Sequence, residues 1–326
     1  PGGLHEGWRD RVQCVNTLRA RFKPFMTRLL LAPLFGIAAS TLMLLNIMFW
    51  TLVLLVSSMV KLVLPFRRLS LQIDAIQLRM AETWIAGNSG CIKLIGRPQW
   101  DISGVDGLNP GQRYLVVCNH QSWVDILVLQ YVLNRRIAVM KFLMRRELIW
   151  VPILGVACWA LGYPLMRSRS RGHPDKLLRD RRRDQVAIRA ACEKFSLVPT
   201  SVMNFVEGTR CTHKKRMRQQ SPYQHLLKPK AGGLALTLEA MGDKFGAVLD
   251  ITIVYPAGAP SMFQYLQGLV PKVIVETRVL PVPSVHGMQG QEGSLLLHDT
   301  CQHWVNQLWR EKDARIAALL AAQTPQ

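Results

Sequence analysis

The chain has 326 residues, of which 49% are hydrophobic and 19% are charged, and this length fits one large α/β domain or one moderate domain with a small appendage. Lys and Arg number 41 against 21 Asp and Glu, a formal charge of +20, which predicts an anionic partner such as phospholipid headgroups, nucleic acid or a phosphorylated substrate. The seven cysteines are scattered without a C-x-x-C pair, which argues against a disulfide framework or a zinc ribbon and predicts free thiols.

The first organised feature is an apolar run over residues 29–64, interrupted only by Pro33, Gly36, Asn46, Lys61 and a few hydroxyls. A single membrane span needs only about 20 apolar residues, so we expect the run to lie in a membrane. Both flanks are basic, and positively charged flanks stay on the cytoplasmic side. This pattern favours a re-entrant helical hairpin that bends near Asn46. One tilted span is the alternative, and a buried core helix is disfavoured because core helices rarely stay apolar on every face for so long.

The remaining chain predicts an α/β domain. Residues 67–99 have the pattern of an amphipathic surface helix, and Asn109-Pro110-Gly111 predicts a turn. Strand-like runs at 114–118, 137–140, 201–206, 248–254 and 272–279 alternate with helical stretches at 124–134, 184–196, 231–241 and, last, 295–322. Such alternation predicts an α/β fold with a mixed central sheet flanked by helices, preceded here by the hydrophobic membrane helix or hairpin.

These elements divide the chain into four predicted segments. They are a basic N-terminal segment (1–28), a membrane-embedded helix or hairpin (29–64), an amphipathic connector that begins the main domain (65–113), and the main domain itself (114–326). Within the main domain, a strongly basic loop spans residues 167–183, with Arg167, Arg169, Arg171, Lys176, Arg179, Arg181, Arg182 and Arg183. The loop is either an ordinary solvated surface or a contact for anionic lipid.

The strongest local motif is Asn119-His120-Gln121-Ser122-Trp123-Val124-Asp125, where a predicted strand ends and a helix begins. A spacing of five places His120 and Asp125 on different faces of one continuous helix. They meet only if His120 lies on the turn before the helix and Asp125 in its first turn. The carboxylate then fixes the imidazole tautomer and leaves the other ring nitrogen to accept a proton from an alcohol. Taken alone, the spacing also fits two unrelated surface residues.

A second motif, Phe205-Val206-Glu207-Gly208-Thr209-Arg210, again follows a predicted strand. Glycine lets backbone N–H groups approach a phosphate, and Arg210 can clamp a phosphate with two hydrogen bonds. Glu207 can orient Arg210 or hold a substrate hydroxyl. A Glu-Gly-Thr turn that merely caps a helix has a similar sequence.

Together the two motifs resemble the NHxxxxD and FxEGTR blocks of the PlsC-type family of 1-acylglycerol-3-phosphate and related lysophospholipid acyltransferases. Two weaker blocks follow the same order, one from Lys141 through Pro152 and Gly155 and the other at Val254-Tyr255-Pro256. The resemblance spans roughly residues 114–256. It implies that His120 and Asp125 are catalytic and that Glu207, Gly208, Thr209, Arg210 and Lys141 bind the substrate phosphate, with Lys228 and Lys230 as further contacts to the acceptor.

The basic stretch from Thr212 to Gly233 is similar to the branch that holds bacterial YihG-like proteins. The resemblance implies transfer of a fatty acyl group from acyl-CoA or acyl carrier protein to the sn-2 hydroxyl of a lysophospholipid, with 1-acyl-glycerol-3-phosphate as the first candidate acceptor and other lysophospholipids as alternatives. Backbone N–H groups at 121–123 or 208–209 are the expected oxyanion donors. The implied partners are the bilayer, the acceptor and the thioester donor, and the implied location is the inner (cytoplasmic) membrane with the catalytic domain facing the cytoplasm.

No resident cofactor and no metal site are expected, since His298 and His303 lie five residues apart and do not align on one helix face. The basic charge leaves nucleic-acid binding as a rival function, which the long apolar run and the lack of a recognised reading motif disfavour. A non-catalytic lipid carrier is the second rival, disfavoured by the His120–Asp125 pair. We therefore expect no nucleic-acid partner.

Overall fold

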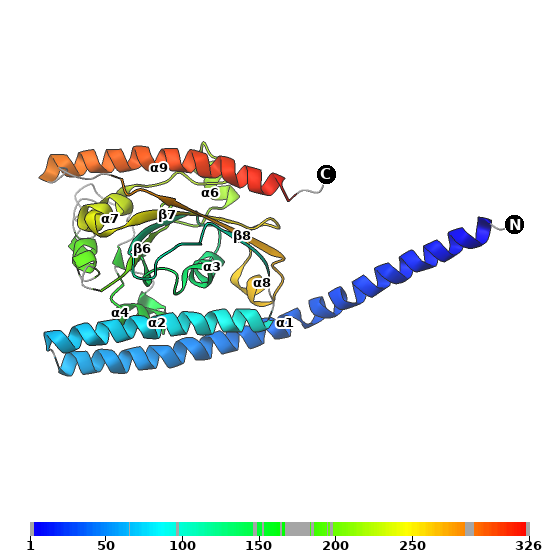
Figure 1. The fold of residues 1–326 in the computed structure, drawn as a ribbon, viewed down its shortest axis with the longest axis horizontal. Helices are drawn as coiled ribbons and strands as arrows, with labels where there is room; N and C mark the ends of the chain where they lie inside the picture. Colours follow the sequence, from blue (N-terminus) through cyan, green and yellow to red (C-terminus); the bar gives the residue numbers. More distant parts are fainter. Residues whose placement is uncertain are drawn as a thin grey trace.

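The computed structural model describes residues 3–323 except 65, 96–97, 146–148, 152, 164, 167–182, 184–185, 194, 196–197 and 284–289. A six-stranded sheet with helices on both faces forms its centre (Figure 1). The strands lie in the order β1 (Gln99–Ser103), β8 (Lys272–Leu280), β7 (Ala247–Val254), β2 (Tyr114–Cys118), β6 (Ser201–Asn204) and β3 (Met140–Phe142). Strands β7, β2, β6 and β3 are parallel, whereas β8 is antiparallel to β7 and β1 is parallel to β8. The predicted α/β fold with a mixed central sheet is confirmed.

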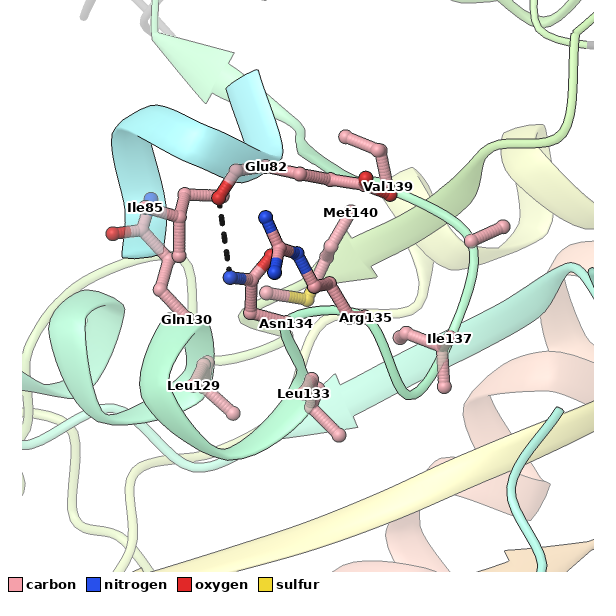
Figure 2. Close-up of a pocket in the computed structure, with 11 residues that line it drawn as sticks. Glu82, Ile85, Leu129, Gln130, Leu133, Asn134, Arg135, Ile137, Val139 and Met140 are labelled. Atoms are coloured by element: carbon pink, nitrogen blue, oxygen red, sulfur yellow. Dashed lines mark hydrogen bonds between the residues drawn. The ribbon is translucent and has the colours of Figure 1, made fainter. Parts of the chain in front are cut away.

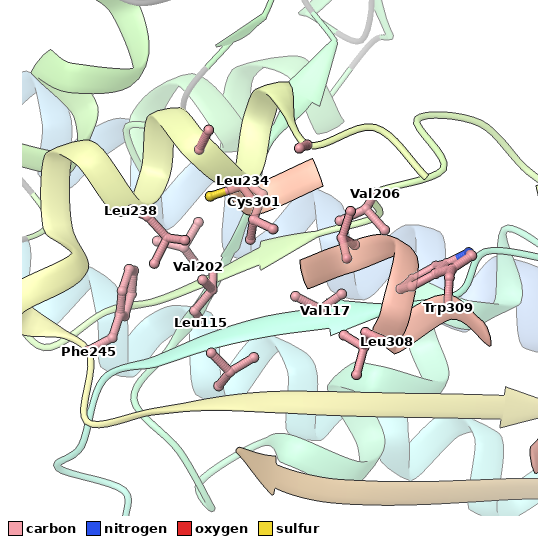
Figure 3. Packing of buried hydrophobic residues seen from close by; sticks show 14 of the residues in the cluster. Leu115, Val117, Val202, Val206, Leu234, Leu238, Phe245, Cys301, Leu308 and Trp309 are labelled. Atoms are coloured by element: carbon pink, nitrogen blue, oxygen red, sulfur yellow. The ribbon is translucent and has the colours of Figure 1, made fainter. Parts of the chain in front are cut away.

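The two central strands explain why the sheet is covered on both faces. Every residue of β2 and of β7 is buried, and both strands are nearly continuous apolar runs, as expected for parallel strands packed on both sides. On one face, helix α7 (Gly232–Met241) and helix α9 (Gly290–Ala321) place Leu234, Leu308 and Trp309 over Leu115 and Val202 (Figure 3). The helical residues 186–193 belong to the same core.

The opposite face is covered by α3 (Val124–Leu133) and α8 (Met262–Leu266), whose side chains pack on the other side of β2 and β7. Beyond them lie the long helices α1 (Gly3–Val63) and α2 (Arg67–Ile95), side by side and antiparallel, with α9 on the far side of the sheet (Figure 1). The short elements are α4 (Leu154–Ala160), α6 (His213–Arg218), the 3-10 turn Gly242–Lys244, and the paired strands β4 (Met144–Arg145) and β5 (Leu165–Met166).

Helix α1 corrects one sequence prediction. The expected bend near Asn46 is wrong, because α1 continues unbroken through that position. Asn46 instead donates sideways to α2, to the Trp84 carbonyl at 3.0 Å and to Asn88 Oδ1 at 2.9 Å. The polar group that suggested a bend is a contact between two helices. The chain turns only between Val63, where α1 ends, and Arg67, where α2 begins.

The C-terminal part of α1 has the dimensions of a membrane span. Leu30–Val63 has a mean hydropathy of 2.1 in its best window, and only 6% of that window is buried. A core helix of a soluble domain would be mostly buried, so this helix has an apolar surface that the rest of the described chain does not cover. It is the one helix in the described residues that is long and apolar enough to cross a bilayer.

Most other predicted elements have close counterparts. The predicted helix at 67–99 corresponds to α2, and the predicted strands 114–118 and 248–254 match β2 and β7 within one residue. The strand expected at 137–140 begins later, at Met140. Six cysteines with described side chains are free thiols, as predicted. Of the basic loop 167–183, only Arg183 falls within the described residues, where it is exposed.

Candidate active site

Three neighbouring parallel strands, β7, β2 and β6, end at the same edge of the sheet. His120 follows β2, the 205–210 segment follows β6 and Tyr255 follows β7. The carboxyl ends of parallel strands are where α/β folds place their sites. The fold therefore brings together three sequence segments that are far apart in the chain.

His120 and Asp125 form the centre of this edge. The imidazole Nδ1 lies 2.9 Å from Asp125 Oδ2, with His120 on the turn and Asp125 in the first turn of α3, as the spacing predicts. The same carboxylate oxygen accepts the backbone N–H of Gln121 at 2.6 Å and of Ser122 at 2.8 Å, so it also fixes the turn between the two residues. The His120 ring stacks on Phe205, with ring centroids 4.0 Å apart.

This geometry leaves one ring nitrogen available for chemistry. Asp125 is fully buried, whereas 12% of the His120 side chain is exposed. Nδ1 faces the carboxylate, and Nε2 has no hydrogen bond to the part of the chain that the structure describes. A buried carboxylate that orients a partly exposed imidazole is the arrangement of a general base.

Tyr255 is a site residue that sequence reasoning missed. Its hydroxyl donates to Asp125 Oδ1 at 2.7 Å, from a position 130 residues away in the chain. Burial, together with the adjacent Asp125 carboxylate, raises the pKa of Tyr255 well above its ordinary value, so the hydroxyl stays protonated and keeps donating. The only sequence signal was the Val254-Tyr255-Pro256 block, which marks the position but not the contact.

The geometry of Glu207 gives no support to its predicted role in phosphate binding. The side chain is completely buried. One oxygen accepts the His120 N–H at 3.0 Å and the other accepts the Leu227 N–H at 3.0 Å. Burial raises the pKa of Glu207 to about 8. Glu207 therefore ties the His120 turn to the 227 loop, and it neither faces an open surface nor contacts Arg210.

The Gly208–Arg210 turn forms a polar rim next to His120. Gly208 has a φ of +67°, which glycine adopts at little cost, and the turn is closed by the Gly208 N–H donating to the Phe205 carbonyl. The Arg210 guanidinium lies 5.0 Å from the ring centroid of Trp123, on the loop between His120 and Asp125. The Cys211 N–H also donates to the His120 carbonyl, at 2.6 Å. The two motifs therefore form one structure.

Lys215 adds a cation that the sequence analysis did not single out as a site residue. Its Nζ donates to Thr209 Oγ1 at 2.6 Å and to the Arg210 carbonyl at 3.0 Å. It is carried by α6, which begins after Thr212, whose hydroxyl accepts the Lys215 N–H. The only sequence signal was the basic composition of the 212–233 stretch.

The three lysines that sequence predicted fall in different places. Lys230 is exposed and its Nζ lies near Gly208, 3.7 Å from where a Cβ at that glycine would sit. Lys228 is exposed between the buried Leu227 and Pro229. Lys141 is buried, donates to the Leu161 carbonyl at 2.7 Å and lies over the Phe195 ring. These contacts hold Lys141 against the core, and they give no support to its predicted role in phosphate binding.

A small cavity lies at the other end of α3 (Figure 2). It is lined by apolar side chains such as Leu129 and Met140, and Asn134 donates there to the Glu82 carbonyl at 3.2 Å. Its volume of about 20 Å³ holds a water molecule but no acyl chain. Because His120 precedes the opposite end of α3, this cavity is not part of the site.

Comparisons of the sequence with known proteins find acyltransferases. The acyltransferase family model matches residues 99–257. Lysocardiolipin acyltransferase 1 of Danio rerio is 25% identical over 257 residues, covering 73% of this chain and 60% of that protein. The 1-acyl-sn-glycerol-3-phosphate acyltransferase delta of Homo sapiens is 26% identical over 214 residues, covering 61% of this chain and 51% of that protein. The chain therefore spans between half and two thirds of the length of these curated relatives.

A solved structure, the 1-acyl-sn-glycerophosphate acyltransferase PlsC of Thermotoga maritima, is 18% identical, with a TM-score of 0.48 over 86% of this chain and 95% of that chain. The family model covers β1, the His120 turn, the Gly208–Arg210 turn and Tyr255. The residues that this model matches thus include each part of the candidate site.

Proposed function

We propose that this chain transfers a fatty acyl group from a CoA or acyl-carrier-protein thioester to the sn-2 hydroxyl of a lysophospholipid. The observation that carries the proposal is the 2.9 Å contact between His120 Nδ1 and the fully buried Asp125. It orients a partly exposed imidazole beside a basic, glycine-containing turn. A protein that only carries lipid has no need of such a pair.

In the proposed reaction, His120 Nε2 removes the proton from the acceptor hydroxyl as that oxygen attacks the thioester carbonyl. A tetrahedral oxyanion forms and collapses, the C–S bond breaks, and the thiolate takes the proton back from His120. Asp125 keeps the imidazole in the required tautomer and stabilises the imidazolium. Direct transfer needs no acyl-enzyme.

Hydrogen bonds within the two turns favour some backbone N–H groups over others as oxyanion donors in this proposal. The N–H groups of Gln121 and Ser122 donate to Asp125, and that of Gly208 donates to the Phe205 carbonyl. Of the backbone groups expected from sequence, Trp123 and Thr209 are therefore the better candidates. A donor that points at the developing oxyanion contributes more to the rate than one already used in a turn.

The acceptor phosphate, in this proposal, binds at the Gly208–Arg210 turn. Arg210 can form two parallel hydrogen bonds with a phosphate, and Lys215 and Lys230 add positive charge next to Thr209 and Gly208. Glu207 acts from beneath by holding the His120 turn. This division of roles replaces the expectation that Glu207 and Lys141 contact the phosphate.

The first candidate acceptor is 1-acyl-glycerol-3-phosphate, which would give phosphatidic acid. A lysocardiolipin-like acceptor is the alternative, because relatives with 25% and 26% identity carry the two different acceptors in their names. We also propose that the chain belongs to the YihG-like branch, on the basis of the basic stretch 212–233. Both acceptors offer a free hydroxyl close to a phosphate, so the same site chemistry fits either.

The proposed partners include the bilayer. The apolar, largely uncovered helix Leu30–Val63 supports membrane association. Because CoA and acyl-carrier-protein thioesters are cytoplasmic, we place the catalytic domain on the cytoplasmic side of the inner membrane.

The test is acyl transfer by detergent-purified protein, with radiolabelled acyl-CoA or acyl carrier protein and a panel of lysophospholipids. His120→Ala should lower turnover by ~10²–10⁴-fold, since general-base catalysis is lost. The matched control is His298→Ala, which removes an exposed His–Asp contact of 3.4 Å on α9 and should leave turnover unchanged. Wild-type turnover in folded His120→Ala would refute the mechanism. Labelling of another acceptor alone would change only the substrate.

A further inference from the structure

One uncharged segment of the chain is not explained by the acyl-transfer site. Residues 148–166 contain no Asp, Glu, Lys, Arg or His, whereas Arg145, Arg146 and Glu147 precede them and Arg167, Arg169 and Arg171 follow. The two ends of the segment meet, because β4 (Met144–Arg145) pairs with β5 (Leu165–Met166). The chain therefore leaves the domain, forms α4 and returns to the same place.

Helix α4 is fixed beside the two long helices. Ala157 and Leu161 are buried in a cluster with Leu54 of α1 and with Ala81 and Trp84 of α2. Helix α4 contacts α1, and Figure 1 shows it in the half of the α1–α2 pair nearer to the turn between the two helices. The inner side of α4 is thus part of the same packing that joins α1 to α2.

The outer side of the segment is apolar and exposed. Trp150 is 83% exposed and Trp159 is 55% exposed, and Val151 and Val156 are also more than two fifths exposed. We call these four residues the tryptophan face. Large apolar patches exposed on a protein mark contact sites for a protein partner or a membrane.

We propose that the tryptophan face enters the membrane interface, as a second lipid contact beside the apolar surface of α1. The inference rests on the membrane partner of the proposed function. Trp prefers the headgroup level of a bilayer, where its ring is buried and its N–H stays hydrated. In the sequence, arginines flank the segment on both sides, a composition that suits contact with anionic headgroups.

Continuity with α1 favours lipid over a protein partner. The exposed residues of α1 in the stretch that packs near α4 include Phe49, Leu52 and Val56, which are 56% to 61% exposed. The surface of α1 and the tryptophan face are therefore neighbouring apolar surfaces on elements that contact each other. A bilayer can cover both, whereas a protein partner would need a separate groove for each.

The test uses tryptophan emission from the full chain in nanodiscs of phosphatidylcholine and phosphatidylglycerol, with plain or brominated acyl chains. Subtracting the spectrum of Trp150→Phe/Trp159→Phe from that of wild type isolates the emission of the two replaced residues. The control is Trp304→Phe, on α9 at the opposite side of the sheet. The single variants Trp150→Phe and Trp159→Phe serve if the double variant loses its fold by circular dichroism.

We expect the Trp150/Trp159 difference spectrum to be blue-shifted and to vanish in brominated nanodiscs, while the Trp304 difference spectrum is the same in both. Equal Trp150/Trp159 spectra in plain and brominated nanodiscs overturn the proposal. If that unquenched emission is blue-shifted, a protein surface such as a second copy covers the face; if it is red-shifted, water does. No substrate is present, so the result is independent of whether acyl transfer is detected.

Discussion

Replacing Tyr255 by Phe removes one hydroxyl and tests how the Asp125 carboxylate is held. That hydroxyl donates to Asp125 Oδ1 at 2.7 Å, while the other carboxylate oxygen takes three donors, from His120, Gln121 and Ser122. Tyr255 is therefore the one described donor to Oδ1. Because its pKa is raised by burial and by Asp125, it donates over the whole pH range of an assay.

The expected loss of stability in Tyr255→Phe can be worked out from the burial of the two residues. Asp125 is fully buried and Tyr255 is 3% exposed, so water does not replace the lost hydroxyl. A hydrogen bond to a charged group contributes about 1.5–3 kcal/mol to the free energy of unfolding. For a domain of this size each kcal/mol changes the melting temperature by about 2–4 °C, so Tyr255→Phe should melt roughly 3–12 °C lower than wild type.

The activity of Tyr255→Phe should change in a way that a loss of stability alone would not produce. With one donor fewer, Asp125 is held less firmly and orients the His120 imidazole less well. Turnover should therefore fall about tenfold, the loss of one buried hydrogen bond, while KM for the acceptor stays close to that of wild type. The assay is acyl transfer at a series of acceptor concentrations, well below the melting temperature of the variant.

The control is Tyr265→Phe. Tyr265 is also buried, at 4% exposure and in the same hydrophobic cluster, but its hydroxyl has no hydrogen-bond partner among the described residues. Its removal should leave stability unchanged or slightly higher, and turnover unchanged. If Tyr255→Phe has the same melting temperature and turnover as Tyr265→Phe, the hydroxyl does not hold Asp125 and the reasoning is wrong.

Two further variants test the surroundings of the site. Burial raises the pKa of Glu207 in the folded state from 4.5 to about 8. Between these two pH values Glu207 therefore keeps its proton in the folded state and loses it on unfolding. Wild-type stability should fall by up to about 1.4 kcal/mol per pH unit from pH 5 to 8, and denaturant unfolding should show no such slope in Glu207→Gln. Lys215→Gln should raise KM for a phosphate-bearing acceptor about tenfold or less, because one charged contact is lost. Lys214→Gln, at an exposed neighbouring lysine, should leave KM unchanged. Equal KM values in the two variants would exclude Lys215 from the phosphate site.

The parts of the site that sequence predicts are those within one strand and the turn after it. His120 and Asp125 are five residues apart at a strand-to-helix boundary, so local geometry alone decides that they meet. The fully buried strands β2 and β7 were also predicted within one residue, because an apolar run bounded by turns leaves few alternatives.

What sequence could not predict depends on pairing between distant segments. The contact of Tyr255 with Asp125 requires β7 to lie next to β2, and the Glu207 contact with Leu227 requires the path of a loop. The predicted bend at Asn46 was wrong for a related reason. A polar residue in an apolar helix indicates a bend only if no partner is available, and the partner, α2, comes later in the chain.

Each of the three parallel strands helps to hold His120. Strand β2 carries His120 itself, the segment after β6 supplies the Phe205 ring and the Glu207 carboxylate, and the residue after β7 holds Asp125. Arg210 stacks on Trp123, which lies on the turn between His120 and Asp125. A phosphate bound at Arg210 therefore acts on the same turn that positions the base. Binding of the acceptor and alignment of His120 are then mechanically coupled, so variants at the phosphate site should change kcat as well as KM.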